Sequence, residues 1–431
     1  MGSARWYTVR LLTKLDENNS YSNILLDESL SRSDFDKRDK KFIAALFYGV
    51  LERRLTLDAI IADLSKNPKS KLNYTLRNIL RCGLYQLKYM DSVPDNAAVD
   101  ESVELAKKCR NPAAPGFTNG LLREFIRRSK ELPKTNSETE RLALEYSCPE
   151  WLVKKWSFEY GKDRCLSLLK TSLGQAPTTI KVNNLSGSVE NTLDMLIADG
   201  VTFERSKILE YAVNVANAGA IEKTEAYRQG KFHVQDIASQ LCCKALDPQP
   251  GDIVLDLCSA PGGKTFTIAE MMNNEGKVLA FDLHPNRVKL IRSGAERLGL
   301  TCVTADVNNA KIFNSDIPVA DKVLVDAPCS GLGVIRRKPE IKYKDPSEFD
   351  RLPEIQGDIL DTASKYVKVN GTLVYSTCTV SKAENDDVIR KFLESHKDFV
   401  PAEDEETFMQ TITPDMYGSD GFFIAKLKRL G

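Results

Sequence analysis

Five short apolar runs, separated by helix-length segments, constrain the fold of this chain more than any other feature of its sequence. Each run ends in a polar or small residue, and together they occupy the region from about residue 231 onward. This alternating order of strand and helix predicts a parallel, doubly wound sheet, whose ligands bind beyond the carboxyl ends of the strands where the strand order reverses. The runs are IVLDL (253–257), KVLAFD (277–282), CVTAD (302–306), KVLVDA (322–327) and TLVYST (372–377).

The first 135 residues follow a different pattern. In LRNILRCGLYQLKYM (76–90) the apolar residues recur at steps of three and four, and KFIAALFYGVLERR (41–54) has the same spacing. Strand-like alternation is nearly absent, and the helix breakers DSVPDNAA (91–98) and RNPAAPG (110–116) stand between the periodic stretches. The pattern predicts an all-helical bundle of about five to seven helices.

The middle of the chain predicts a small insert. ELPKTNSETE (131–140) has the composition of a linker, and a helix carrying Trp151 and Trp156 follows it. TTIKVNN (178–184) alternates like a strand, and NTLDMLIADG (191–200) is spaced like a helix. The 431 residues therefore divide into a helical domain over 1–135, a linker and small α/β subdomain over 136–230, and a Rossmann-like catalytic domain over 231–431.

Composition excludes several classes of protein. No apolar run reaches the length of about 18–20 residues that crosses a bilayer, and no secretion signal is visible, so we expect a cytoplasmic protein without a membrane partner. Ten cysteines without CxxC spacing and three histidines predict reduced thiols and no metal site. The sequence holds 60 basic and 60 acidic residues, so the formal net charge is zero and does not indicate a nucleic-acid partner.

Three clusters of basic residues are nevertheless candidates for an RNA-binding surface. They are Arg53–Arg54, REFIRRSK (123–130) and RRKPEIKYK (336–344). The first two are either contacts for the phosphate backbone or solvated faces balanced by acidic neighbours. We expect the third, RRKPEIKYK, to grip the phosphate backbone together with the helical domain.

The segment CSAPGGKT (258–265) resembles a phosphate-binding loop but lacks its essential parts. The glycine that should stand five positions before the Gly-Lys-Thr is Cys258, and Pro261 removes a backbone amide. Asp282 ends the second run, where a carboxylate accepts hydrogen bonds from ribose hydroxyls. The site therefore predicts a ligand with a ribose and an adenine but no phosphate, and S-adenosylmethionine is the common cofactor of that kind.

The motifs DLCSAPGGKT, FDLHPNR, DAPCSGLGVIRRKPEIKY and YSTCTV occur in this order. They resemble the RNA cytosine-C5 methyltransferases of the NOL1/NOP2/Sun family. The front of the chain, with RDKKFIAALFYGVLERR and FTNGLLREFIR, is similar to the NusB-like RNA-binding domain. Together these resemblances imply a bacterial enzyme that methylates small-subunit ribosomal RNA, and we expect a monomer.

The resemblance also implies roles for individual residues. Asp282 binds the cofactor's ribose, Asp306 lies beside its adenine, and Asp326 faces both the cofactor and the target base. Capping of strand ends is the structural alternative for these aspartates. The motif FDLHPNR adds Arg287 to the cofactor site. The residues expected to wrap the methionine part are Cys258, Ser259, Ala260, Pro261, Gly262, Gly263 and Lys264.

Two cysteines are the candidate catalytic thiols. Carbon 5 of cytosine becomes nucleophilic only after a thiolate adds to carbon 6, so covalent catalysis is required. DNA cytosine methyltransferases use the cysteine of Pro-Cys, which is Cys329 here, whereas the RNA family uses that of Thr-Cys, which is Cys378. We follow the RNA assignment: Cys378 attacks and Cys329 assists release. Asp326 relieves charge at N3 of the base, and Lys264 is a candidate for lowering the thiol pKa.

Some observations leave alternatives open. The family commonly has two glutamates before the asparagine that follows Thr-Cys, and here the run is Ala383-Glu384-Asn385; we expect Glu384 to keep the cap of the next helix. Gln235 and Asp236 either shape the entrance of the site or have a purely structural role. The substrate alternatives are transfer RNA and large-subunit RNA, and the functional alternative is a non-catalytic RNA-binding assembly factor.

Overall fold

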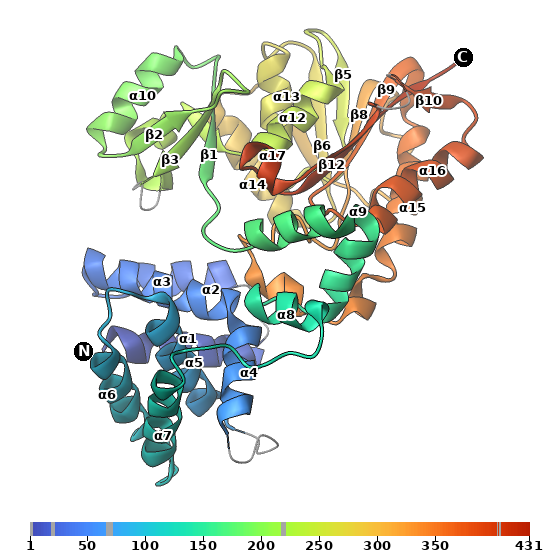
Figure 1. The fold of residues 1–431 in the computed structure, drawn as a ribbon. Coiled ribbons are helices and arrows are strands. Elements are labelled where there is room, and N and C mark those ends of the chain that lie inside the picture. The colour runs from blue at the N-terminus through green and yellow to red at the C-terminus, as the bar shows by residue number, and fades with distance from the viewer. Residues whose placement is uncertain (1–2, 19–21, 66–71, 217–220, 403, 405–406) are drawn as a thin grey trace. The chain divides into compact units, whose positions relative to one another are not determined.

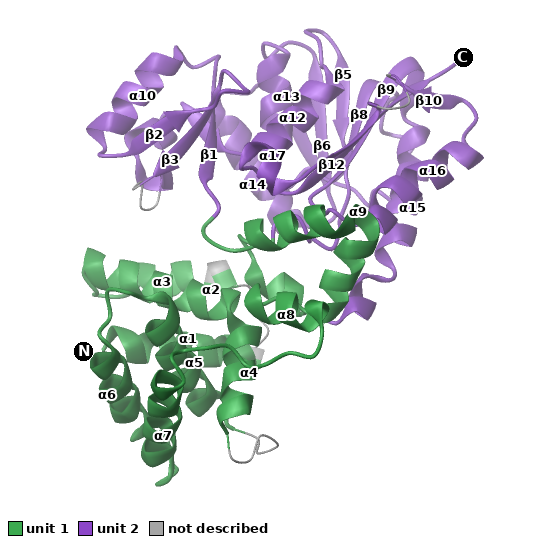
Figure 2. Cartoon of the chain, in the orientation of Figure 1, with its two compact units in different colours: residues 1–175, 335–344 green, residues 176–334, 345–431 purple. Residues whose placement is uncertain are grey.

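The computed structural model describes residues 3–18, 22–65, 72–216, 221–402, 404 and 407–431. Its contacts divide the chain into two compact units, which Figure 2 shows in green and purple. The first unit comprises residues 1–175 and 335–344, and the second comprises residues 176–334 and 345–431. The domain boundaries expected from sequence differ from this division and stay a prediction.

The first unit is helical, as expected. Seven helices lie before residue 128 in its described part, and their apolar faces form one buried core (Figure 1). Side-chain caps fix some of the helix starts: Asn73 accepts a hydrogen bond from the backbone of Leu76 at the start of α5. The helices are α1 (Ala4–Asn18), α2 (Ser22–Ser31), α3 (Lys37–Glu52), α4 (Arg54–Leu64), α5 (Tyr74–Tyr89), α6 (Asp95–Ala106), α7 (Ala114–Arg127), α8 (Glu138–Glu145) and α9 (Glu150–Thr171).

The short helix η2 (Pro339–Tyr343) belongs to this helical unit although it lies far along the chain. The Lys342 ammonium is fully buried and donates a hydrogen bond of 2.9 Å to the carbonyl oxygen of Glu52. The Tyr343 hydroxyl donates to the carbonyl of Leu51 at 2.6 Å. The expectation that the whole cluster 336–344 grips RNA phosphates is therefore wrong for Lys342, whose charge faces the protein interior.

The other two basic clusters are paired with acidic neighbours. Arg54 lies 3.5 Å from Asp16. In the second cluster Arg127 and Arg128 both pair with Glu124. The second cluster therefore has the contacts of the balanced, solvated face that the sequence left as an alternative. The first cluster is balanced by acidic neighbours but is largely covered, since the Asp16 side chain is only 5% exposed.

The second unit begins with a small antiparallel sheet in the order β2-β3-β1-β4. One helix, α10 (Val189–Ala198), packs its apolar side on this sheet, and the strand and helix expected at TTIKVNN and NTLDMLIADG are confirmed. The other elements of this part are β1 (Thr178–Val182), β2 (Thr202–Arg205), β3 (Ala212–Ala216), η1 (Ile221–Lys223), α11 (Glu225–Arg228) and β4 (Phe232–Val234).

The main sheet of the described residues has eight strands, and five of them are parallel, in the order β7-β6-β5-β8-β9 with β7 at the edge. The chain winds one way from β5 to β7 and then returns to β8, so the strand order reverses between β5 and β8. All five expected strands are confirmed: β5 (Ile253–Asp256), β6 (Lys277–Asp282), β7 (Val303–Val307), β8 (Ala320–Asp326) and β9 (Val367–Thr377).

Three further strands extend the sheet beyond β9. They were not predicted from the sequence. The strand β12 pairs antiparallel with β9, β10 and β11. They are β10 (Phe399–Pro401), β11 (Met409–Ile412) and β12 (Phe422–Arg429).

Helices cover both faces of this sheet, and the pleat of the strands explains how. Val323 and Val325 point into one buried core with α15 and α16, whereas Leu324 points into the other with α12, α13 and α14. The three-layer, doubly wound fold expected from the apolar runs is confirmed. The helices are α12 (Ile237–Leu246), α13 (Gly263–Met271), α14 (Pro285–Leu298), η3 (Pro346–Phe349), α15 (Leu352–Ser364), η4 (Lys382–Glu384), α16 (Asp386–Ser395) and α17 (Pro414–Tyr417).

The described residues contain neither a helix that could span a membrane nor a cluster of metal ligands. None of the helices there is long and apolar enough to cross a membrane. No group of three or more histidine, cysteine or acidic side chains is arranged there to hold a metal ion.

Candidate active site

The loop between β5 and α13 is locked to the ends of two strands. Both the backbone amide and the hydroxyl of Ser259 donate to the carbonyl of Phe281, at 2.8 and 2.9 Å. The Thr265 hydroxyl donates to the buried carboxylate of Asp256 at 2.7 Å. Gly262 has a φ of 112°, and a Cβ there would lie 2.3 Å from the ring of Phe266. The loop therefore needs a glycine at this turn, where α13 begins.

The carboxylates at the ends of β6 and β7 lie in different surroundings. Asp282 is buried and accepts a hydrogen bond from the backbone of His284 at 3.0 Å, with Arg287 at 3.4 Å from its other oxygen. Asp306 has 67% of its side chain exposed and pairs with Arg292 at 2.9 Å. The expected cofactor residues Asp282 and Arg287 are thus brought together, whereas Asp306 lies at the solvent-exposed rim.

The charges around the loop suit a nucleoside without phosphates. The pKa of the Cys258 thiol is raised, first by burial and then by the negative charges of Asp256, Asp326 and Asp282. The same carboxylates would repel a phosphate, but a ribose diol can donate hydrogen bonds to Asp282 and a cationic sulfonium is attracted to the group. The charges and hydrogen-bond acceptors around the loop therefore fit S-adenosylmethionine.

Lys264 and Asp326 form an ion pair at the point where the strand order reverses. The ammonium lies 2.8 Å from one carboxylate oxygen of Asp326, and the Ser376 hydroxyl donates to the other at 2.9 Å. Burial is the largest single effect and lowers the pKa of Lys264, but Asp326 together with the neighbouring Cys242 and Cys243 raises the pKa overall. Lys264 is thus held as an ammonium whose first partner is Asp326.

The two candidate catalytic cysteines lie side by side. Cys329 follows the end of β8, Cys378 follows the end of β9, and their sulfur atoms are 3.3 Å apart. The pKa of Cys329 is raised well above its ordinary value, first by its hydrogen bond with Cys378, then by burial and by the negative charges of Cys378 and Glu384. The two expected catalytic thiols are thus brought into direct contact at the ends of neighbouring strands.

The other eight cysteines and Glu384 also had roles predicted from the sequence. All ten cysteines are free. Five of the eight outside the candidate pair are buried, as expected for core residues: Cys82, Cys148, Cys165, Cys242 and Cys243. The expected cap role of Glu384 is wrong, since its carboxylate accepts hydrogen bonds from Ser330 and the N-cap of α16 is Asn385.

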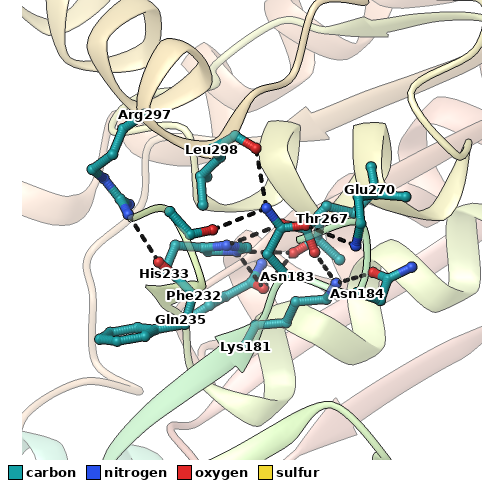
Figure 3. A network of polar contacts seen from close by, with 12 residues as sticks. Lys181, Asn183, Asn184, Phe232, His233, Gln235, Thr267, Glu270, Arg297 and Leu298 are labelled. Atoms are coloured by element: carbon teal, nitrogen blue, oxygen red, sulfur yellow. Dashed lines mark hydrogen bonds and ion pairs between the residues drawn. The ribbon is translucent and has the colours of Figure 1, made fainter. Parts of the chain in front are cut away.

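Behind the loop, a buried polar network fixes α13 to the small sheet (Figure 3). Lys181 on β1 forms an ion pair with Glu270 on α13, and both side chains are almost fully buried. His233 on β4 lies 3.4 Å from the same carboxylate. The Thr267 hydroxyl donates to the side chain of Gln235 at 2.6 Å, so the structural alternative for Gln235 is the one that these contacts support.

Two parts of this site were missed by the sequence analysis. Ser376 stands in the quoted YSTC motif, but its hydrogen bond to Asp326 depends on the pairing of β8 with β9. Lys181 and Glu270 are 89 positions apart, and a lone charged residue in an apolar strand or helix was the only indication of their pairing.

Asp236, for which the sequence left two roles open, caps α12 and accepts a hydrogen bond from the backbone of Asp420. These contacts support its structural role.

Family models match three parts of the chain. Residues 243–428 match "16S rRNA methyltransferase RsmB/F", residues 2–127 match the NusB family, and residues 148–222 match the "Methyltr_RsmF/B-like, ferredoxin-like domain". The expected Rossmann-like catalytic part, NusB-like front and α/β insert are thereby confirmed.

Whole-chain relatives agree with these matches. "Probable ribosomal RNA small subunit methyltransferase B" of Bacillus subtilis is 38% identical, covering 100% of this chain and 99% of its own, and that of Synechocystis sp. is 33% identical, covering 100% of both chains. The crystal structure of PH0851 superposes with a TM-score of 0.84 at 26% identity, covering 100% of this chain and 99% of that one. Methyltransferases of this kind use S-adenosylmethionine, as expected. The chain therefore belongs to the ribosomal RNA small subunit methyltransferase B family, RsmB, of S-adenosylmethionine-dependent RNA methyltransferases.

Proposed function

We propose that this protein methylates carbon 5 of a cytosine in 16S ribosomal RNA through a covalent adduct between Cys378 and carbon 6 of the base. The observation that carries the proposal is the contact of two thiols, 3.3 Å apart, at the edge of the sheet where Asp326 and Lys264 also lie. Relatives that cover the whole chain are named for the small ribosomal subunit, which supports this RNA as the substrate. The enzyme acts as a cytoplasmic monomer.

Cys378 begins the reaction. Its thiolate adds to carbon 6, forming a carbon–sulfur bond, and the electron pair of the C5–C6 double bond moves toward carbon 5 and N3. At the N3 edge of the ring, the carboxyl group of Asp326 gives its proton to N3 as charge builds up there, and Lys264 balances the charge of the carboxylate that remains. The target base has to be unstacked for this attack, because carbon 6 is approached perpendicular to the ring.

Asp282 with Arg287 and the loop 258–264 would hold S-adenosylmethionine, which when bound would supply the methyl group as an electrophile. After carbon 5 has been methylated, a base takes up its hydrogen as a proton, and the electron pair of that C–H bond restores the C5–C6 double bond. The Cys378–C6 bond breaks with its electron pair returning to sulfur, and Cys329, in contact with that sulfur, assists release.

Methylation of defined RNAs tests this proposal. Purified protein is incubated with isotope-labelled S-adenosylmethionine and with 16S ribosomal RNA, 23S ribosomal RNA or transfer RNA, and the digested nucleosides are separated. Label in 5-methylcytidine from 16S RNA alone is the expected result, and bisulfite sequencing of cellular RNA with and without the gene then identifies the position. Label in another nucleoside would refute the carbon-5 chemistry, and label only in 23S or transfer RNA would refute the substrate. Absence of label from all three, with RNA binding intact, would favour an assembly factor.

A further inference from the structure

The strand-end loops that carry the two catalytic cysteines meet at one buried carboxylate. Glu384 is 2% exposed and lies on η4, just before α16. Its carboxylate accepts from the backbone amide of Ser330 at 2.8 Å and from the Ser330 hydroxyl at 2.6 Å. The Gln356 side chain donates to it at 3.1 Å. Three donors from two other elements therefore converge on this one group.

These contacts hold both neighbours of Cys329. Ser330, directly after the cysteine, is bound to Glu384 through two hydrogen bonds. The same Gln356 amide that contacts Glu384 also donates to the carbonyl of Pro328, directly before the cysteine, at 3.0 Å. The backbone on either side of Cys329 is thus fixed relative to a single carboxylate.

The next residue, Asn385, holds both neighbours of Cys378 in the same way. The Thr377 hydroxyl donates to the Asn385 side chain at 2.6 Å, and the Asn385 amide donates to the carbonyl of Thr379 at 3.0 Å. The hydroxyls of Ser330 and Thr379 also contact each other at 2.8 Å, which joins the two loops directly. Two consecutive residues, 384 and 385, therefore connect the backbone around one thiol to the backbone around the other.

We propose that Glu384 is a positioning residue, which together with Asn385 sets the distance between the sulfur atoms of Cys329 and Cys378. The proposal rests on the proposed function for its catalytic meaning, but the geometry itself can be measured without any reaction on RNA. The negative charge of Glu384 also contributes to the raised pKa of Cys329 and so helps this thiol to keep its proton. A single carboxylate is sufficient for this role, which fits the run Ala383-Glu384-Asn385, where a second glutamate is missing.

A trivalent arsenical measures the separation of the two thiols directly. Phenylarsine oxide reacts with two neighbouring thiols to form two arsenic–sulfur bonds, and one water molecule is released. In the wild type, peptide mapping by mass spectrometry is expected to find one arsenic bridging Cys329 and Cys378. Glu384→Gln keeps the size of the side chain but removes its charge and one acceptor, and we expect this bridge to form at least about tenfold more slowly, since small displacements of paired groups carry large losses. The matched control is Glu394→Gln, an exposed glutamate on α16, which should react like the wild type.

Turnover provides the second readout. With 16S RNA as substrate, Glu384→Gln should lower kcat by about tenfold to a hundredfold while KM for S-adenosylmethionine stays the same, because the cofactor residues do not touch Glu384. Ser330→Ala removes the hydroxyl contacts to Glu384 and Thr379 but keeps the hydrogen bond from the backbone amide to Glu384, and it should give a smaller change in the same direction. If Glu384→Gln does not fold, Ser330→Ala carries the test alone.

The outcomes separate this inference from the proposed function. Bridging at the wild-type rate in Glu384→Gln, or in Ser330→Ala if only that variant folds, overturns the positioning role whatever the turnover. A slower bridge in a protein that methylates no cytosine supports the positioning role and refutes the reaction.

Discussion

At the scale of single residues, the site consists of pairs of groups at the ends of neighbouring strands. The sulfur atoms of Cys329 and Cys378 are 3.3 Å apart, and the Lys264 ammonium lies 2.8 Å from Asp326. The hydrogen bond with Cys378, burial and the neighbouring charges of Cys378 and Glu384 raise the pKa of Cys329. The proposed nucleophile, Cys378, follows the RNA methyltransferases, and the alternative known from DNA cytosine methyltransferases is Cys329.

Asp282 and Asp306 should contribute unequally to cofactor binding. Asp282→Asn is expected to raise Kd for S-adenosylmethionine by about tenfold or more, because a hydrogen bond to a charged group contributes about 1.5–3 kcal/mol. Asp306→Asn should have a smaller effect, since that carboxylate is exposed and paired with Arg292. Isothermal titration calorimetry measures both, and equal losses in the two variants would contradict the assignment of the ribose to Asp282.

The individual site residues were predictable to different degrees. Asp282, Asp326 and the two cysteines each stand at the end of an apolar run or in a motif, so the sequence predicts them as site residues. Ser376 was missed because its partner is selected by strand pairing. Glu384 was identified as notable but given the wrong role, because a helix cap is a local interaction and its real partner, Ser330, lies 54 positions away.

At the scale of elements, buried charged side chains connect segments that lie far apart in the sequence. Lys342 on η2 has a pKa lowered from 10.5 to about 8, mainly by burial. Between these values the unfolded chain binds a proton that the folded chain has released, so this residue makes the protein more stable as pH rises from about 8 to 10.5. Below that window, burial of the charged ammonium costs stability.

Lys342→Met should remove this pH dependence. The difference in thermal midpoint between pH 8 and pH 10 is expected to shrink relative to the wild type, as followed by circular dichroism. Lys344→Met, at an exposed position in the same segment, is the control and should leave the difference unchanged. A wild-type pH profile in Lys342→Met would show that this lysine is not buried as a charge.

The pair of Lys181 and Glu270 should behave as one coupled unit. Removal of one partner from a buried ion pair costs about 3–5 kcal/mol, because the other charge is left unpaired. Lys181→Met is therefore expected to be strongly destabilising, and the double variant Lys181→Met with Glu270→Gln should lose clearly less than the sum of the single losses. Urea unfolding measures the cycle. Additive losses would mean that the network in Figure 3 does not couple β1 to α13.

At the scale of the whole molecule, the sequence predicted the layers better than the edges. The five parallel strands were recognisable because buried strands read as continuous apolar runs. The strands β10 and β11 lack such runs, and β12 does contain one, Phe422–Ala425, but the chain around it does not follow the alternation of strand and long helix. The place of 335–344 within the helical unit depends on contacts with residues about 290 positions earlier. Local periodicity does not encode contacts at that separation.

RNA binding by the whole chain should depend on salt. Phosphate contacts release counterions, with a slope of log affinity against log salt of about −0.7 to −0.9 for each phosphate neutralised. Filter binding of 16S RNA fragments between about 50 and 200 mM salt should show a clear decline, and Lys342→Met should not change the slope because Lys342 is buried. Affinity that stays flat with salt would contradict an electrostatic grip on the RNA backbone.

The central claim is that the sulfur of Cys378 bonds to the base. The most direct test is trapping with an RNA that carries 5-fluorocytidine at the target position, because fluorine cannot leave as a proton and the adduct persists. The wild type and Cys329→Ala are expected to form an RNA–protein adduct that survives denaturing gel electrophoresis, whereas Cys378→Ala is expected to form none. An adduct in Cys378→Ala together with none in Cys329→Ala would exchange the roles of the two cysteines, and no adduct in any of them would refute covalent catalysis.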